Sequence, residues 1–272
     1  MAAANPRPRL DVLLVERGHF ETRARAAAAI LAGEVLRLPD RRRLDKPGQM
    51  VDVDVKLEIA ERLQYVSRGG VKLANALDGF GLDVAGSVAL DVGASTGGFT
   101  DCLLQRGASH VVALDVAYGE LSWKLREDER VTVIERHNAR AVQPTELPYA
   151  PELIVMDLSF ISLTKVLPAV LACAASRYDC LAMVKPQFEV GRERVGKGGV
   201  VRDGAIRRDA LVSVGRAALD LGAAVMGYAS SGLPGPKGNR ETFLWLAESG
   251  RPRAVDDLEA AACVVEPAAV KS

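Results

Sequence analysis

The chain has 272 residues, which suits one small and one medium domain, and 49% of them are apolar, enough for a core in each. Only 5% are aromatic, which argues against an exposed aromatic surface for stacking single-stranded nucleic acid. The net charge is zero, but residues 1–50 hold ten Lys and Arg against six Asp and Glu, so we expect this basic region to bind a polyanion.

The charge excess of residues 1–50 is small and would also suit an ordinary solvated surface. Residues 1–65 are predicted to form a small α+β domain. Apolar residues recur at helical spacing in two stretches; the first ends at Gly18 and Thr22 caps the second. A basic hairpin and alternating valines and acidic residues then predict a small sheet. The helices are expected at residues 9–17 and 23–31, the strands at 35–38 and 51–57, and the hairpin at 40–43.

A junction at residues 59–70 precedes a second domain, predicted at residues 71–272. After a helix at 71–80, buried apolar strands alternate with helices, which is typical of a doubly wound, mostly parallel sheet. The seven strands are expected at 88–92, 111–116, 131–134, 153–156, 180–184, 223–229 and 241–246, and the helices between them at 98–106, 122–125, 163–175 and 206–221. This is a Rossmann-like α/β fold, in which ligands bind at the carboxyl ends of the strands.

The most specific local signal is a glycine-rich turn between the first of these strands and the following helix. The glycines let the backbone approach a ligand, and the free N–H groups at the helix start favour an anion, such as the methionine carboxylate of S-adenosylmethionine. The spacing fits a methyltransferase better than the G-x-G-x-x-G of nicotinamide enzymes, with a tight turn that binds nothing as the alternative. The residues of this candidate cofactor site are Asp91, Gly93, Ala94, Ser95, Thr96, Gly97, Gly98 and Phe99.

Polar side chains at the ends of later strands complete the predicted cofactor site. Asp115, followed by Val116, ends the second strand, where a carboxylate can accept hydrogen bonds from both ribose hydroxyls. Asn138 follows the third strand, where its amide either contacts the adenosine or only forms a turn. Asp157 ends the fourth strand and is expected to face the methyl group.

Four charged residues at strand or helix ends form a candidate catalytic set: Lys72, Asp157, Lys185 and Glu241. Each alone would suit an ordinary surface residue. The segment after Asp157 lacks the two prolines of base-amino methyltransferases, and neither a Pro-Cys nor a Thr-Cys pair is present there to attack a pyrimidine ring. The acceptor atom is therefore predicted not to belong to a base ring.

Cysteine and histidine spacing does not predict a metal site. The four cysteines form no C-x-x-C pair, and the three histidines do not stand at zinc-ligand spacing. No apolar run reaches the roughly twenty residues that a membrane span needs, and no secretory segment opens the chain. We expect a reduced, cytosolic protein.

Several long stretches resemble the TlyA family of rRNA 2′-O-methyltransferases, some of which carry the name haemolysin. They lie at residues 67–99, 115–119, 157–162, 184–199 and 232–246, so the resemblance covers nearly the whole chain. It implies methylation of a ribose 2′-hydroxyl, with S-adenosylmethionine as cofactor. The substrate implied is cytidine in the rRNA of the small ribosomal subunit, the large one, or both, in the cytoplasm.

The second domain is similar to FtsJ-like ribose methyltransferases, whose catalytic set is Lys-Asp-Lys-Glu. The matching positions are Lys72, Asp157, Lys185 and Glu241. By this resemblance Lys185 would activate the hydroxyl, as a neutral base or as a charged helper, and Asp157 would hold it. Lys72 and Glu241 would orient the ribose and the lysine.

The amino-terminal domain resembles an RNA-binding module shared by a small-subunit ribosomal protein and pseudouridine synthases. Its motifs appear as Arg9-Leu10-Asp11, Arg17-Gly18, Thr22-Arg23 and Gly33-Glu34-Val35, whereas Leu38-Pro39-Asp40-Arg41 replaces the usual Asn-Gly turn and leaves the shape of the hairpin open. The resemblance implies that arginines grip RNA phosphates, which positions a substrate more than it specifies it. The candidates are Arg9, Arg17, Arg23, Arg25, Arg41, Arg42, Arg43 and Arg68.

Three alternatives remain at this point. A membrane-active haemolysin would need an apolar span or a basic amphipathic helix rich in Trp or Phe, neither of which the sequence contains. An RNA-binding protein without catalysis is disfavoured because all four catalytic positions are filled. A methyltransferase acting on a ring nitrogen is disfavoured by the missing prolines.

Overall fold

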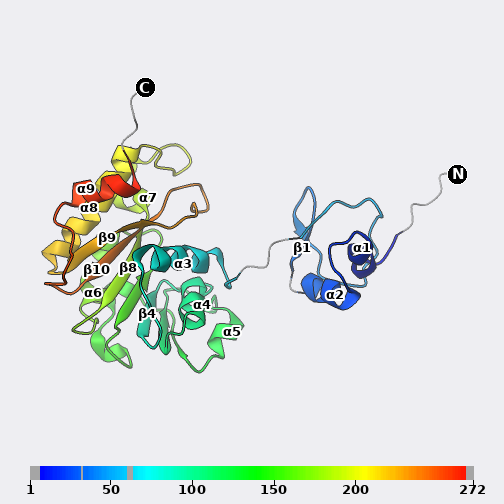
Figure 1. Ribbon diagram of the computed structural model, residues 1–272, viewed down its shortest axis with the longest axis horizontal. Coiled ribbons are helices and arrows are strands. Elements are labelled where there is room, and N and C mark those ends of the chain that lie inside the picture. Colours follow the sequence, from blue (N-terminus) through cyan, green and yellow to red (C-terminus); the bar gives the residue numbers. More distant parts are fainter. Residues whose placement is uncertain (1–6, 32, 60–63, 268–272) are drawn as a thin grey trace. The chain divides into compact units, whose positions relative to one another are not determined.

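The computed structural model describes residues 7–31, 33–59 and 64–267. The chain divides into two compact units, Met1–Leu63 and Gln64–Ser272, and each is described by itself (Figure 1). The boundary between the two units, after Leu63, falls within the predicted junction at 59–70. Residues 60–63 lie outside the described part, whereas Tyr65 is buried in the core of the second unit.

The amino-terminal unit combines two helices with a three-stranded antiparallel sheet of order β2-β1-β3. Its elements are α1 (Leu10–Glu16), α2 (Arg23–Leu31), β1 (Val35–Arg37), β2 (Arg42–Arg43) and β3 (Leu57–Ile59). Leu10, Leu14, Ile30 and Val35 are fully buried between these elements. Apolar residues at helical spacing therefore form the core, as their periodicity predicts.

The strand predicted at residues 51–57 is wrong except at its last residue. β3 begins only at Leu57, and a turn precedes it. The carbonyl oxygens of Val53 and Val55 accept hydrogen bonds from the guanidinium group of Arg17, at 2.5 and 2.6 Å. Because these carbonyls bind a side chain, they do not enter a sheet ladder, and the alternation of valines with acidic residues could not reveal this.

The second unit is built on a seven-stranded sheet of order β6-β5-β4-β7-β8-β10-β9. Its strands are β4 (Val88–Val92), β5 (His110–Leu114), β6 (Val131–Ile134), β7 (Leu153–Met156), β8 (Asp179–Val184), β9 (Ala224–Ser230) and β10 (Thr242–Ala247). The pairs from β6 to β8 are parallel, and β10 runs antiparallel to both β8 and β9. The predicted mostly parallel α/β fold is confirmed, with every strand within two residues of its expected bounds.

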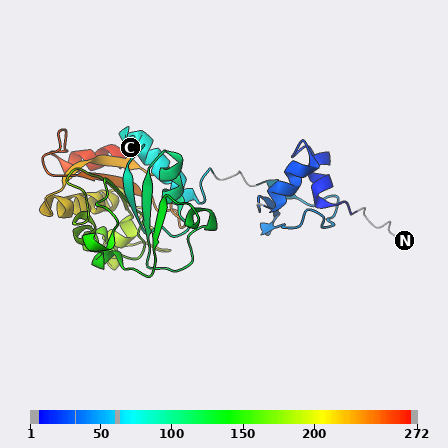
Figure 2. The same cartoon turned by 90° about the horizontal axis from the view of Figure 1, so that it is seen from below.

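Helices cover both faces of this sheet (Figure 1 and Figure 2). Successive strand residues alternate between the faces, so Ala89 packs toward one side and Leu90 toward the other. One side holds α3 (Arg68–Phe80), α4 (Gly98–Gln105) and α5 (Trp123–Arg126). The other holds α6 (Leu167–Leu171), α8 (Gly204–Asp220) and α9 (Leu258–Val265). The remaining helical turns are η1 (Ala139–Ala141), η2 (Pro144–Glu146), η3 (Leu163–Lys165), α7 (Pro186–Glu189) and η4 (Arg192–Arg194).

Local sequence signals explain where α3 begins and ends. Ser67 is its N-cap, and the serine hydroxyl accepts a hydrogen bond from the backbone N–H of Gly69 at 3.3 Å. Gly81 ends the helix in the left-handed conformation, with φ +66°. The helix therefore starts at Arg68, three residues before its predicted start at residue 71, and Lys72 lies in its second turn.

Candidate active site

The glycine-rich turn brings the backbone after β4 against the backbone after β7. Gly93 has φ +86°, and a Cβ atom at this position would lie only 2.7 Å from the carbonyl oxygen of Asp157. Gly97, the N-cap of α4, has φ +91°. Both positions therefore require glycine for conformation and for space. The turn places the backbone of Gly93 against the strand end that carries Asp157, and the start of α4 follows in the chain.

Asp91 lies beneath this turn and is completely buried. Its Oδ2 accepts hydrogen bonds from the backbone N–H of Thr100, at 2.9 Å, and from the Thr100 hydroxyl, at 2.7 Å. Its Oδ1 is buried without a hydrogen-bond partner among the described residues. Burial, reinforced by the charges of Asp157 and Asp115, raises the pKa of Asp91 to about 7. An acceptor of this kind suits a cationic amine donor.

Asp115 closes the turn from the end of β5. Its Oδ2 accepts a hydrogen bond from the backbone N–H of Ser95 at 2.7 Å, and its Oδ1 accepts one from Ala117 at 2.8 Å. The Ser95 hydroxyl donates to Glu120 at 3.1 Å, a residue that the sequence did not single out. Each carboxylate oxygen keeps a second lone pair, so Asp115 can still accept from a ligand hydroxyl.

The other predicted cofactor residues differ in how accessible they are. Thr96 is exposed beside Ser95, and Val116 is exposed after Asp115. Ala94, Gly98 and Phe99 are buried, and the Phe99 ring packs against Phe243 with 5.8 Å between the ring centroids. The Asn138 side chain caps η1 by accepting from the backbone N–H of Arg140, at 3.0 Å. Phe99 therefore packs in the core, and Asn138 forms a turn, while its contact with the adenosine stays a prediction.

The first candidate catalytic pair lies at the ends of β7 and β8. The Lys185 ammonium group lies 2.6 Å from Oδ1 of Asp157 and donates a hydrogen bond to the Ser159 hydroxyl at 2.9 Å. Lys185 is only 8% exposed, so its ammonium group is largely shielded from solvent. Ser159 was not predicted as a site residue, although its position two residues after Asp157, at the end of the same strand, could have indicated it.

The second candidate catalytic pair joins α3 to the start of β10. Lys72 and Glu241 form a buried ion pair, with Lys72 7% and Glu241 3% exposed. Thr242 pairs with Val184 in the sheet, so Glu241 and Lys185 are the next residues along two adjacent antiparallel strands. The structure therefore brings all four predicted catalytic residues to one edge of the sheet.

Two aromatic residues follow the members of the first pair in the chain, and their rings contact each other. Phe160 is 91% exposed and has φ +65°, and its ring lies against Phe188, with 5.3 Å between centroids. Phe160 is three residues after Asp157, and Phe188 is three after Lys185. A small number of aromatic residues is thus compatible with an exposed ring beside the site.

Most of the predicted RNA-binding arginines have partners within the protein. Arg9 and Arg23 both bind the buried carboxylate of Asp11, at 3.1 and 2.9 Å, and the Arg9 hydrogen bond in particular lowers the pKa of Asp11 to about 2. Arg25 pairs with Glu21 at 2.7 Å. The remaining partners are the Val53 and Val55 carbonyls for Arg17, Glu58 for Arg41 and the Pro234 carbonyl for Arg68, which lies in the second unit.

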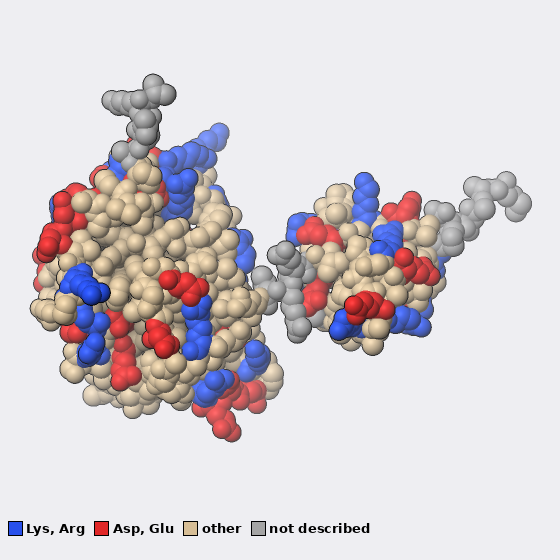
Figure 3. Space-filling view, viewed as in Figure 1, with Lys and Arg blue, Asp and Glu red and all other residues tan. Residues whose placement is uncertain are grey.

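Arg42 and Arg43 are exposed and form no ion pair within the described part of the chain. They line a groove of about 280 Å³ together with Arg7 and Arg37, which the sequence reasoning missed. The Nε2 atom of Gln49 is buried at this groove without a hydrogen-bond partner among described residues. Over the face of this unit seen in Figure 3, Lys and Arg side chains are interspersed with Asp and Glu.

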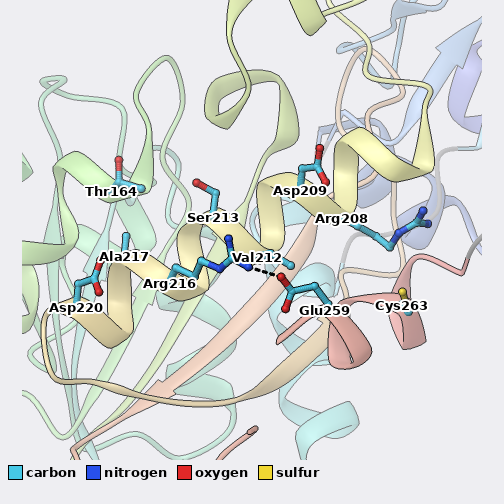
Figure 4. Close-up of a pocket in the computed structure, with 10 residues that line it drawn as sticks. All are labelled: Thr164, Arg208, Asp209, Val212, Ser213, Arg216, Ala217, Asp220, Glu259 and Cys263. Atoms are coloured by element: carbon cyan, nitrogen blue, oxygen red, sulfur yellow. Dashed lines mark hydrogen bonds and ion pairs between the residues drawn. The ribbon is translucent and has the colours of Figure 1, made fainter. Parts of the chain in front are cut away.

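A larger cavity, of about 440 Å³, lies between α8 and α9, where Arg216 pairs with Glu259 (Figure 4). It contains none of the predicted site residues. Among the described residues, no helix is long and apolar enough to cross a membrane. Within the same residues, no group of three His, Cys, Asp or Glu side chains could hold a metal ion.

Known proteins resemble this chain over most of its length. A family model for FtsJ-like methyltransferases matches residues 65–248. The 16S/23S rRNA (cytidine-2′-O)-methyltransferase TlyA of Mycobacterium tuberculosis is 49% identical over 248 residues, which cover 88% of this chain and 90% of that protein. Hemolysin A of Brachyspira hyodysenteriae is 39% identical over 234 residues, which cover 86% of this chain and 97% of that protein.

A solved structure shows the same agreement in three dimensions. A Streptococcus thermophilus protein that bears a hemolysin name superposes with a TM-score of 0.72 and 40% identity, over 96% of both chains. The resemblance predicted from the sequence is thus confirmed, and the chain belongs to the TlyA family of FtsJ-like methyltransferases.

Proposed function

We propose that this chain methylates the ribose 2′-hydroxyl of a cytidine in ribosomal RNA, in the cytoplasm, with S-adenosylmethionine as methyl donor. The observation that carries the proposal is the presence of two ion pairs, Lys185–Asp157 and Lys72–Glu241, at the sheet edge that also holds the glycine turn. The named activity of the Mycobacterium tuberculosis relative supports cytidine and both ribosomal subunits.

The residues of the turn fit the proposed cofactor. When bound, S-adenosylmethionine would supply a sulfonium methyl group, which a nucleophile can attack in line while the sulfur leaves as a neutral thioether. Asp91 offers a buried acceptor for the amino group, and the backbone N–H groups at the start of α4 suit the carboxylate. Asp115 would accept hydrogen bonds from the ribose hydroxyls.

The side chains of the protein would have to position and activate the ribose 2′-hydroxyl, which is a weak nucleophile. The Lys185 ammonium group would stabilise the oxygen of the 2′-hydroxyl as its proton is lost, or its neutral amine would take that proton. Asp157 and Ser159 hold the Lys185 nitrogen in one place, at 2.6 and 2.9 Å. The Lys72–Glu241 pair would orient the ribose, and Phe160 offers a flat face to an unstacked base.

The site also supports a ribose acceptor rather than a base ring. Attack on a pyrimidine carbon needs a thiolate nucleophile, and three of the four cysteines are buried in the core. The exposed one, Cys263, lies on α9, on the α6–α8–α9 side of the sheet. A lysine–aspartate pair suits a hydroxyl instead, because the hydroxyl needs only help in losing its proton.

The experiment that tests the proposal is methylation of purified, unmethylated ribosomal subunits with labelled S-adenosylmethionine. Digestion and mass analysis of the product locate the methyl group on the ribose or on the base and identify the nucleotide. Lys185→Ala should lose roughly 10²- to 10⁴-fold in rate. Lys165→Ala is the matched control, because Lys165 is exposed and forms no ion pair among the described residues. A methyl group on a base, or full activity of Lys185→Ala, would overturn the proposal.

A further inference from the structure

Two loops border the catalytic edge of the sheet on the side away from the glycine turn. One, residues 190–203, follows Lys185 and α7, contains η4 and ends at the start of α8. The other, residues 231–240, leads directly into Glu241. Both loops are therefore attached to catalytic strand ends, one after β8 and one before β10.

A single buried side chain fastens the two loops together. Asn239 is 2% exposed; its Oδ1 accepts a hydrogen bond from the backbone N–H of Val201 at 2.9 Å, and its Nδ2 donates to the carbonyl of Gly199 at 2.8 Å. The amide thus replaces two backbone partners that the first loop lacks. Gly235 of the second loop lies so close to Glu241 that a Cβ atom there would collide with the carboxylate.

A second buried polar side chain, that of Arg207, binds the loop at residues 190–203. Arg207, 9% exposed, donates hydrogen bonds to the carbonyls of Val201 and Arg202, at 3.2 and 2.7 Å. It also pairs with Glu266, 3% exposed, through two hydrogen bonds of 2.8 and 2.7 Å. Residues 199–202 are therefore held on two sides by buried polar side chains, and networks that are satisfied in this way make a loop rigid.

The rigid loops carry cations that the protein itself does not neutralise. Lys197, Arg202 and Lys237 are exposed and form no ion pair within the described part of the chain. The Lys237 side chain lies over Gly199, so the two loops present their charges together. In Figure 3, Lys and Arg side chains gather where Figure 1 draws the loop that follows α7. Such unpaired cations suit phosphate groups of a polyanion.

We propose that residues 196–202 and 234–240, joined by Asn239, form one cationic ridge of the catalytic unit that binds the RNA backbone next to the target nucleotide. This inference rests on the proposed function, because it takes ribosomal RNA as the substrate. The ridge belongs to the unit Gln64–Ser272 alone and lets that unit bind RNA phosphates with its own side chains.

The experiment measures equilibrium binding of the full chain to purified ribosomal subunits across a range of salt concentrations. Charge reversal in Lys197→Glu/Lys237→Glu should weaken binding roughly tenfold or more at low salt and lower the slope of log affinity against log salt by about one for each phosphate that is no longer bound. The matched control is Arg177→Glu/Arg253→Glu, two exposed cations at the opposite edge, before β8 and after β10. Affinity for S-adenosylmethionine should stay at the wild-type value in both variants.

Asn239→Asp tests the connection between the loops, since a carboxylate would face the Gly199 carbonyl that the amide now donates to. We expect the same fall in salt slope and a raised KM for the subunits, with little change in S-adenosylmethionine affinity. A wild-type slope in Lys197→Glu/Lys237→Glu, or an equal fall in the Arg177→Glu/Arg253→Glu control, would overturn the ridge. The binding measurement is independent of catalysis, so a chain that binds but leaves the ribose unmethylated would contradict only the proposed function.

Discussion

The candidate site residues of the two units use charge in different ways. In the catalytic unit, Lys72 and Lys185 are buried against carboxylates at strand ends, with 9% and 10% of their side chains exposed. In the amino-terminal unit, Arg25 and Glu21 form an exposed pair, with 69% and 79% of their side chains exposed. Exposed pairs contribute little to stability and can exchange a carboxylate for a phosphate, whereas buried pairs cannot separate without a large penalty.

The same residue types therefore serve two tasks. By the proposed function, the buried pairs would hold the reacting groups in a fixed geometry before substrate arrives, which is what methyl transfer needs. If the exposed arginines bind RNA as predicted, phosphates would compete with their internal partners for the same guanidinium groups. Each of the following tests changes one side of the comparison.

The largest effect is expected from breaking the buried pair at β10. Glu241→Gln leaves the Lys72 ammonium group buried without its counter-ion and should lower the free energy of unfolding by about 3–5 kcal/mol. The Lys72→Met/Glu241→Gln double variant removes both charges, so much of that stability should return while methylation stays lost. Chemical denaturation and single-turnover methylation measure the two effects separately. A double variant with wild-type activity would show that the pair is only structural.

A smaller effect is expected from the protonation of Asp91. Because burial raises its pKa to about 7, the carboxylate is protonated below that pH and ionised above it. If Asp91 binds the amino group of S-adenosylmethionine, affinity should rise roughly tenfold between about pH 6 and pH 8, as the ionised fraction rises. Asp91→Asn should bind weakly and without this pH dependence. Calorimetric titration at several pH values measures it, and equal pH profiles for both proteins would refute the assignment.

The amino-terminal unit should respond through RNA affinity alone. Arg42→Glu/Arg43→Glu removes two exposed guanidinium groups without internal ion pairs, so binding to ribosomal subunits should weaken and the salt slope should fall by about one for each phosphate released. Arg25→Glu should have a smaller effect, since Arg25 is already paired with Glu21. If S-adenosylmethionine affinity fell equally in these variants, the division of labour between the units would be wrong.

The smallest effect is expected at Asp11. Its pKa is lowered to about 2 in the folded chain, so the carboxylate stabilises the unit above the usual Asp pKa, and this contribution disappears as the pH falls from about 4 toward 2. Asp11→Asn should therefore cost about 1 kcal/mol at neutral pH, a modest value because Arg9 and Arg23 are well exposed. Hydrogen exchange of α1 amides measures this cost. A penalty that persists unchanged when the carboxylate is protonated would contradict the ionic explanation.

Several features of the fold and the site could be predicted from local sequence. The strand bounds in the second unit follow from continuous apolar runs, since a strand buried on both faces tolerates few polar residues. The turn after β4 follows from Gly93 and Gly97, whose positive φ angles and close neighbours exclude side chains. Lys72, Asp157, Lys185 and Glu241 were identified from their places at strand or helix ends and from their match to the Lys-Asp-Lys-Glu set of FtsJ-like enzymes. Functional residues of this fold lie at the carboxyl ends of the strands.

Other features depended on contacts between residues far apart in the chain. The turn before β3 follows from Arg17, which donates to the carbonyls of Val53 and Val55, and no periodicity records that choice. The exposure of Phe160 and the hydrogen bond between Ser159 and Lys185 depend on how the end of β7 meets the end of β8. The low aromatic content argued only against an exposed aromatic surface for stacking single-stranded nucleic acid, and it did not bear on a single exposed ring.

Local sequence was enough to set the order of elements, the glycine turn and the charged residues at strand ends, because these depend on backbone conformation and on burial along short segments. In contrast, the packing of segments far apart in the chain decides which partner each charged side chain binds. Asp157 binds Lys185, Glu241 binds Lys72, Asp11 binds two arginines, and Asn239 joins two loops. Such pairings depend on strand order and register, which bring together residues that no short stretch of sequence connects.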